Sequence, residues 1–459
     1  MNKLRQLWSN LRSSFWFVPS LIVVFSIALA VALVEADSAG SDLWLARWPR
    51  LFGAGVEGAR GMMSTIAGSM MTVVGVTFSM ILVVLALASS QYSSRILRNF
   101  MRSRVTQVVL GIFAGIFTYS LIVLRTIRGG DEGAFVPSLA VFFGFVLALG
   151  GVGALMFFIH YIASSIQASN IIASVASETV QAIERLFPEN PGQEPADSID
   201  DPSPDLLAER SWRTVLAGKS GYIQIVDNDA LMRVAQDMDT IVRMERGIGE
   251  FVVRDTALVS LALRDPLDQE TVAALQATFT ISRHRTVEQD AAFGIRQIVD
   301  VALKALSPGI NDTTTAVMCV DYLTVILARL APRRITSLYR YGEERLRVIA
   351  RGPGFESLLT ESFDQIRGNA SGNFVIMSRM IDAILTLAGL TTTPQRRRAL
   401  LDQVQWIAEL AGRTLEAKHD RTRINTQITR VREMLESEPA LCAKEGKPHS
   451  QACLPNMTA

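Results

Sequence analysis

Long apolar runs dominate the first third of the chain. Four stretches contain no Asp, Glu, Lys or Arg, and they run from Phe15 to Val34, Met62 to Ala88, Val108 to Leu124 and Val136 to Ile162. A helix of about 20 apolar residues spans the hydrocarbon layer of a bilayer. Three stretches reach that length, and flanking residues extend the stretch that begins at Val108. The pattern predicts an α-helical membrane bundle of four transmembrane helices over residues 1–163.

Composition agrees with a membrane location. The 459 residues balance 45 basic against 44 acidic side chains, and 49% of them are hydrophobic. Residues 1–163 hold 12 of the basic and 6 of the acidic side chains, so the basic excess lies in the hydrophobic part. Disordered chains and proteins that coat nucleic acids need low hydrophobicity or a large charge excess. We therefore expect the lipid bilayer as a partner and no nucleic acid.

The short loops predict the orientation of the spans, because Lys and Arg are retained on the cytoplasmic side. Basic residues without nearby acids precede the first span and connect the second to the third: Lys3, Arg5, Arg12, Arg95, Arg98, Arg102 and Arg104. The other two loops mix acids and bases. We expect a multi-pass membrane protein with four crossings and both termini cytoplasmic. The spans lack ionisable residues except His160, which argues against proton-coupled transport.

The second apolar stretch carries small and weakly polar residues at helical spacing: Ser64, Gly68, Thr72, Gly75 and Ser79. One interpretation is a helix-packing face, on which small residues let two backbones approach. The other is the lining of a pore. Because the third and fourth stretches also contain glycines, the sequence alone favours packing. So many small-residue faces also favour a homo-oligomer.

The remaining residues divide by pattern into five segments. We expect a connecting helix at 164–187, an acidic Pro-rich linker at 188–205, a small α/β domain at 206–285, a helical domain at 286–435 and a disordered tail at 436–459. The linker has five prolines and six acids without a basic residue. Apolar segments from Ser220 to Asp227 and Phe279 to Arg283 read as strands, with a helix predicted from Asn228 to Met244.

A turn between two predicted helices, Ser307-Pro308-Gly309-Ile310-Asn311-Asp312, is the most distinctive motif. A helix N-terminus with free N–H groups binds anions when basic residues complete the site. The candidate anion or ligand residues are Arg283, Arg285, Arg296, Asn311, Asp312, Thr313 and Thr314. A well-capped turn beside a salt-bridge network is the simpler interpretation, and the residues favour it.

The segment from Glu288 to Arg296 (EQDAAFGIR), the SPGIND turn and the four spans together resemble a widespread bacterial family of predicted inner-membrane proteins of unknown function. The resemblance covers nearly the whole chain. It implies a membrane location and this fold, and it implies no activity. One position departs from that family, in which a proline often follows the Asn-Asp pair, whereas this chain has Thr313.

The sequence contains no Gly-x-Ser-x-Gly, His-Glu-x-x-His or P-loop motif and no Gly-x-Gly-x-x-Gly after a predicted strand. We therefore expect no enzyme, no cofactor and no metal. His284, with Glu288 and Asp290 nearby, is the one plausible acid/base group. The spacing of Cys442, His449 and Cys453 matches no common metal site. The basic run Arg396 to Arg398 reads as a solvated helix face.

Three hypotheses for function follow from these patterns. The first is an oligomeric ion channel lined by the second transmembrane helix and gated by its cytoplasmic domain. The second is a membrane-anchored scaffold or sensor that binds a cytoplasmic protein partner without transport. The third is a membrane-bound enzyme that uses His284 and the region from Asp290 to Asp312.

Overall fold

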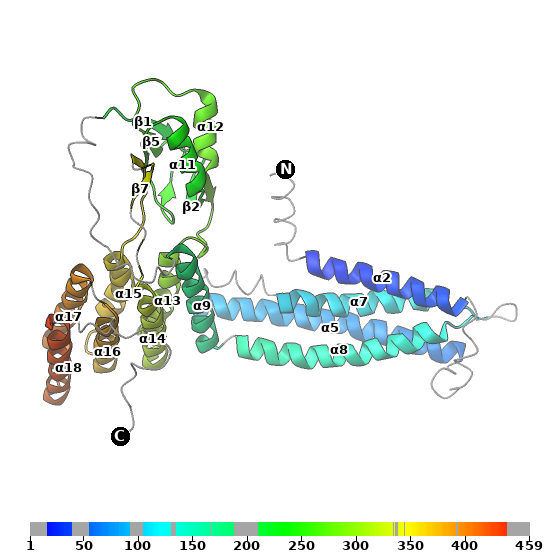
Figure 1. The fold of residues 1–459 in the computed structure, drawn as a ribbon. Helices are drawn as coiled ribbons and strands as arrows, with labels where there is room; N and C mark the ends of the chain where they lie inside the picture. Colours follow the sequence, from blue (N-terminus) through cyan, green and yellow to red (C-terminus); the bar gives the residue numbers. More distant parts are fainter. Residues whose placement is uncertain are drawn as a thin grey trace, which may run out of the picture. The chain divides into compact units, whose positions relative to one another are not determined.

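The computed structural model describes residues 16–38, 55–91, 104–129, 135–165, 167–187, 210–333, 335, 338–343, 345–391 and 393–437. The chain forms two compact units, Met1–Ile171 and Ile172–Ala459, each of which is described by itself (Figure 1). The predicted linker at 188–205, the tail at 436–459 beyond residue 437, and Cys442, His449 and Cys453 lie outside the described residues.

The first unit consists of four long apolar helices that match the four stretches read from the sequence. They are α2 (Phe17–Ser38), α5 (Val56–Gln91), α7 (Arg104–Thr126) and α8 (Ser138–Ser165). Helix α7 contacts the other three helices and contributes the fully buried Phe113 and Tyr119 to their common core. The apolar runs therefore form a bundle in which α7 is the central element (Figure 1).

Polar contacts fix one end of this bundle. The carboxylate of Asp37, at the end of α2, accepts hydrogen bonds from the backbone N–H groups of Leu139 and Ala140 at 3.2 and 3.1 Å. The Tyr119 hydroxyl donates to the carbonyl oxygen of Ala140 at 2.7 Å. Asp37 thus satisfies free N–H groups in the first turn of α8, where a negative charge is stabilising.

The described residues contain five helices that are long and apolar enough to cross a membrane, one more than the four expected. The fifth is α14 (Thr313–Leu330) in the second unit. The sequence predicted this helix but not as a span, since it carries Asp321 and Arg329. Its high hydropathy comes from a broad face that packs against α13, α15 and α16.

Two small sheets build the first part of the second unit. Strand order in the larger is β1 (Arg213–Leu216), β5 (Ala257–Leu261), β3 (Val242–Met244), β8 (Arg345–Ile349) and β7 (Tyr339–Gly342). The smaller sheet has the order β4 (Phe251–Val252), β2 (Gly221–Val226) and β6 (Phe279–Ser282). All pairs are antiparallel except β3 with β8. Helices α11 (Asn228–Asp237) and α12 (Gln269–Ala277) complete this α/β region.

Two predictions for this region were wrong. The helix expected from Asn228 to Met244 ends at Asp237, because Asp239 takes a positive φ of 42° and Val242–Met244 forms strand β3. Residues 286–435 were expected to form a helical domain, in which the type of the stretch around Glu343 to Arg351 was left open, but strands β7 and β8 lie within them. Pairing of β8 with β3 joins residues about a hundred positions apart, which local patterns do not report.

Seven helices form the rest of the second unit: α9 (Ala168–Leu186), α13 (Ala291–Ala305), α14, α15 (Phe355–Asn369), α16 (Phe374–Leu390), α17 (Pro394–Thr414) and α18 (Lys418–Glu436). Helix α13 packs against α14 and α15, α14 also packs against α16, and α16, α17 and α18 contact one another (Figure 1). The connecting helix predicted at 164–187 corresponds for the most part to α9, and its first two residues belong to the end of α8.

Buried arginines cap the ends of several of these helices. Arg396, 1% exposed, donates to the carbonyl oxygens of Ala331 and Arg333 at 2.8 and 3.0 Å, just after α14 ends. Arg397 donates to Leu435 and Ser437 carbonyls at the end of α18. The expected solvated face at Arg396 and Arg397 was therefore wrong, because both guanidinium groups satisfy terminal carbonyls that no helical N–H can reach.

Candidate functional site

The five small residues of α5 lie on its outer surface. Ser64, Gly68, Thr72, Gly75 and Ser79 are all exposed in the chain. A Cβ atom added at Gly68 or Gly75 would meet nothing within 4 Å. The buried side chains of α5, including Met63, Ile66 and Met70, lie on another face of the helix. Packing within this chain therefore leaves the stripe of small residues uncovered.

Four glycines of α7 and α8 differ, because they lie at helix contacts: Gly111, Gly115, Gly144 and Gly151. Gly150 and Gly153 of α8 are as open as the α5 glycines. A Cβ at Gly111 would lie 2.7 Å from Ile22 Cδ1 and 3.0 Å from the backbone of Pro19. The corresponding distance at Gly144 is 2.9 Å, to Met63 Cε. Such distances leave no space for a side chain, so these glycines let neighbouring helices approach closely.

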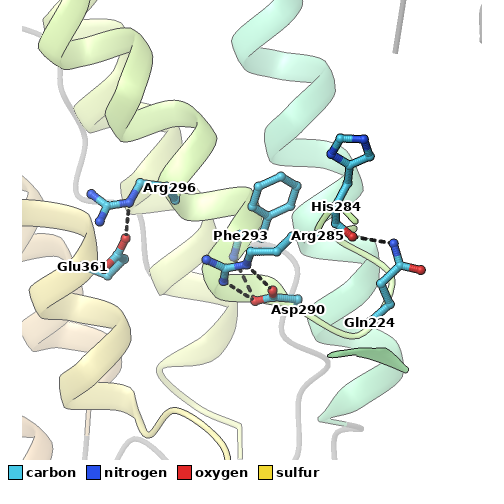
Figure 2. Close-up of polar contacts among 7 residues, drawn as sticks. All are labelled: Gln224, His284, Arg285, Asp290, Phe293, Arg296 and Glu361. Atoms are coloured by element: carbon cyan, nitrogen blue, oxygen red, sulfur yellow. Dashed lines mark hydrogen bonds and ion pairs between the residues drawn. The ribbon is translucent and has the colours of Figure 1, made fainter. Parts of the chain in front are cut away.

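The predicted anion site at the SPGIND turn is not assembled. Arg285 donates to both carboxylate oxygens of Asp290, at 2.8 and 3.0 Å, and Arg296 forms an ion pair with Glu361 at 2.8 Å (Figure 2). Arg283 is exposed. Arg285 is thus neutralised by Asp290, the N-cap residue of α13. Arg296 of α13 is neutralised by Glu361 of α15.

The two halves of the predicted site also lie at opposite ends of α13. Asp290 caps the first turn of α13, whereas Asp312 follows the last turn across the SPGIND connection. A rise of 1.5 Å per residue over the 15 residues of α13 separates these ends by about 22 Å. No single small anion can bridge them.

Asp312 is the N-cap of α14. Its carboxylate accepts from the backbone N–H of Thr315 at 3.0 Å and from the Thr315 hydroxyl. These hydrogen bonds hold the pKa of Asp312 below its ordinary value of 3.8. A carboxylate therefore already satisfies the N–H groups that an external anion would need, which agrees with the capped-turn interpretation.

The remaining residues of this turn have structural contacts or are exposed. Asn311 takes a positive φ of 50°, and Thr314 is exposed. The hydroxyl of Thr313 accepts a hydrogen bond from the side chain of Asn373 at 3.2 Å. A proline at position 313 has no hydroxyl, so this contact to the first turn of α16 is particular to threonine.

The EQDAAFGIR segment is accounted for by packing at the start of α13. Gln289 Oε1 accepts from the backbone N–H of Val226 at 3.0 Å, and Asp290 Oδ1 accepts from that of Phe293 at 3.0 Å. Arg285 lies over the Phe293 ring, 5.1 Å from its centroid. A Cβ at Gly294 would collide with the side chain of Thr179 on α9. The motif thus joins α13 to α9 and to strand β2.

His284 is not placed for acid/base catalysis with Asp290. Its backbone carbonyl accepts from the Gln224 side chain at 2.5 Å, and its imidazole points away from the Asp290 carboxylate (Figure 2). Asp290 is 5% exposed and both its carboxylate oxygens are used by Arg285. The described residues contain no group of three or more His, Cys, Asp or Glu side chains that could hold a metal ion.

The second unit contains a cavity that the sequence did not indicate. Its volume is about 150 Å³. Apolar side chains of Phe187, Ile248, Leu338 and Leu358 line it together with the guanidinium-bearing Arg340. Phe187 directly follows α9, Leu338 directly precedes β7, Arg340 lies in β7, Leu358 lies in α15 and Ile248 lies in a loop, and only the fold brings them together. No local pattern in the sequence indicates this cavity.

Comparison with known proteins identifies the family. Residues 12–386 match the family described as "Predicted membrane protein (DUF2254)", and the chain belongs to this family. The resemblance noted in the sequence is thereby confirmed. Membership and the apolar helices support a multi-pass membrane protein.

The chain is also similar to mycobacterial proteins of undetermined role. Uncharacterized protein Rv1290c of Mycobacterium tuberculosis is 29% identical over 447 residues, which cover 95% of this chain and 83% of that protein. Uncharacterized protein Mb1321c of Mycobacterium bovis shows the same identity and coverage. No solved structure matches the chain.

Proposed function

We propose that the protein is an oligomeric ion channel of the bacterial inner membrane, with a pore lined by the small residues of α5. The supporting observation is that a Cβ atom added at Gly68 or Gly75 would meet nothing within 4 Å among the described residues. Gly150 and Gly153 of α8 are open in the same way, but the α5 stripe adds the exposed hydroxyl groups of Ser64, Thr72 and Ser79. This weakly polar face is available to a second copy or to water. Small, weakly polar residues suit either a conduit or a close subunit contact.

The proposal places four helices in the bilayer, α2, α5, α7 and α8, with both termini in the cytoplasm. Helix α14 stays outside the membrane in this arrangement. It forms an ion pair through Asp321 to Arg379, and Cys319, Leu323 and Leu327 are fully buried against other helices of the second unit. The cytoplasmic unit would act on the pore through α9, which follows α8 directly in the chain.

The experiment is ion flux from liposomes that contain the purified protein, under separate anion and cation gradients. Gly75→Leu fills the proposed conduit without meeting any atom of its own chain, so the variant folds and loses most of the flux. Val76→Leu is the matched control, because Val76 is exposed on the neighbouring face of the same turn, 56% accessible. Equal flux through the native protein and Gly75→Leu would contradict the proposal.

The second candidate function is a membrane-anchored scaffold or sensor without transport activity. The observation in its favour is the size of the second unit, which contains its own cores and a cavity independent of the spans. In that case native liposomes are silent although the protein is a uniform oligomer, and the cytoplasmic unit binds a protein partner.

A further inference from the structure

The cavity of the second unit contains an arginine without a partner. Arg340 on β7 lines the cavity, and its Nε atom is fully buried and has no hydrogen-bond partner. None of the described residues forms a hydrogen bond or an ion pair with its guanidinium. Burial lowers the pKa of Arg340 below its ordinary value, although the negative charge of Asp229 raises it. Arg340 as a whole is half-buried, but its buried Nε–H group has lost water without gaining an acceptor, which is unfavourable until an acceptor takes that place.

Other charged groups around the cavity are already neutralised. Asp290 binds Arg285 through both carboxylate oxygens. Arg351 donates to Glu250 Oε1 at 2.8 Å. Among the described residues that line the cavity, Arg340 is therefore the charged residue without a direct hydrogen bond or ion pair, although Asp229 acts on it electrostatically. An acceptor that completes this environment must be an anion or carry a strong hydrogen-bond acceptor.

The rest of the lining limits the size and polarity of such a ligand. Most of the lining side chains are apolar, among them Leu186, Ile335 and Pro353. A cavity of about 150 Å³ accommodates a molecule about the size of benzene. An inorganic anion would leave the apolar walls unfilled, and a nucleotide is too large.

We propose that this cavity binds a small organic carboxylate, with its carboxylate on Arg340 and its apolar body against Phe187 and Leu358. The site is separate from the α5 stripe, so the proposal does not depend on ion conduction. Because Leu186 is the last residue of α9 and Phe187 follows it, a bound carboxylate would lie at the end of the helix that follows the membrane unit in the chain.

The test is calorimetric titration of the full-length protein in detergent with benzoate as the probe. Benzamide has the same shape without the charge, and inorganic phosphate has charge without the apolar body. We expect benzoate to bind at one site per chain and at least about tenfold more tightly than either analogue. Equal binding of benzamide or phosphate, or no binding of benzoate at millimolar concentration, would overturn the proposal.

Two variants show whether Arg340 provides the contact. Arg340→Gln should weaken benzoate binding about tenfold or more. The unliganded variant should melt no lower than the native protein, because the substitution removes a buried charge that no described side chain pairs. Arg345→Gln is the control on the adjacent strand, where the arginine side chain is 71% exposed and outside the cavity. Unchanged affinity in Arg340→Gln, or equal losses in both variants, would contradict the assignment.

Discussion

Helices α5 and α7 carry the same signal in sequence and use it differently. Each has glycines on one face, Gly68 and Gly75 in α5 and Gly111 and Gly115 in α7. The α7 glycines are covered by Ile22 and Ser26 of α2, whereas a Cβ added at either α5 glycine would meet nothing within 4 Å among the residues that the structure describes. A small-residue face thus shows that close approach is allowed, and only the fold shows whether the chain itself makes that approach.

The largest expected effect is on stability, when a glycine in each helix is replaced by leucine. Gly111→Leu should destabilise the first unit by about 1–3 kcal/mol or more, because the new side chain would overlap Ile22 and the backbone of Pro19. Gly68→Leu should leave stability nearly unchanged, since no atom lies within 4 Å of its Cβ position. Thermal unfolding in detergent measures both. Equal destabilisation by the two substitutions would remove the distinction between α5 and α7.

A smaller effect on stability is expected at the SPGIND turn. This turn, like the α5 stripe, had a structural and a functional interpretation. Asp312→Ala removes the N-cap of α14 and should lower the free energy of unfolding by about 1 kcal/mol. Because hydrogen bonds lower the native pKa of Asp312, its stabilisation is complete above the ordinary value of 3.8 and is lost as the pH falls through the lowered value.

Unfolding measured between neutral and acidic pH checks this assignment. The difference in free energy of unfolding between the native protein and Asp312→Ala should become smaller as the Asp312 carboxylate is protonated. A difference that stays constant down to the most acidic pH at which the protein folds would show that Asp312 does not act as a charged cap.

The sequence predicted the elements that local patterns determine. The apolar runs yielded α2, α5, α7 and α8, and the Asn-Asp pair before three threonines predicted the start of α14. Features that depend on distant residues could not be read in this way. The parallel pairing of β3 with β8, the burial of Arg396 under the end of α14 and the position of Arg340 in a cavity all need tertiary contacts.

The candidate sites divide in the same manner. Sequence spacing places Ser64, Gly68, Thr72, Gly75 and Ser79 on one helix face, because a single regular helix, α5, carries them all. It wrongly grouped Arg285 with Asp312, because the 15 residues of α13 lie between them. Residues at helical spacing within one helix lie close together in space. Residues at the two ends of a helix do not, even when few residues separate them in the sequence.

The central claim, that water reaches the α5 stripe, is tested most directly by cysteine accessibility in proteoliposomes. Cys442→Ser and Cys453→Ser remove the tail thiols, and the remaining Cys319 is buried. A thiol reacts with a charged, water-soluble thiosulfonate only where water lets the thiolate form. We predict modification of Thr72→Cys and none of Met71→Cys, its neighbour at the same depth. Equal reactivity at the two positions, or none at Thr72→Cys, would contradict a water-filled conduit along α5.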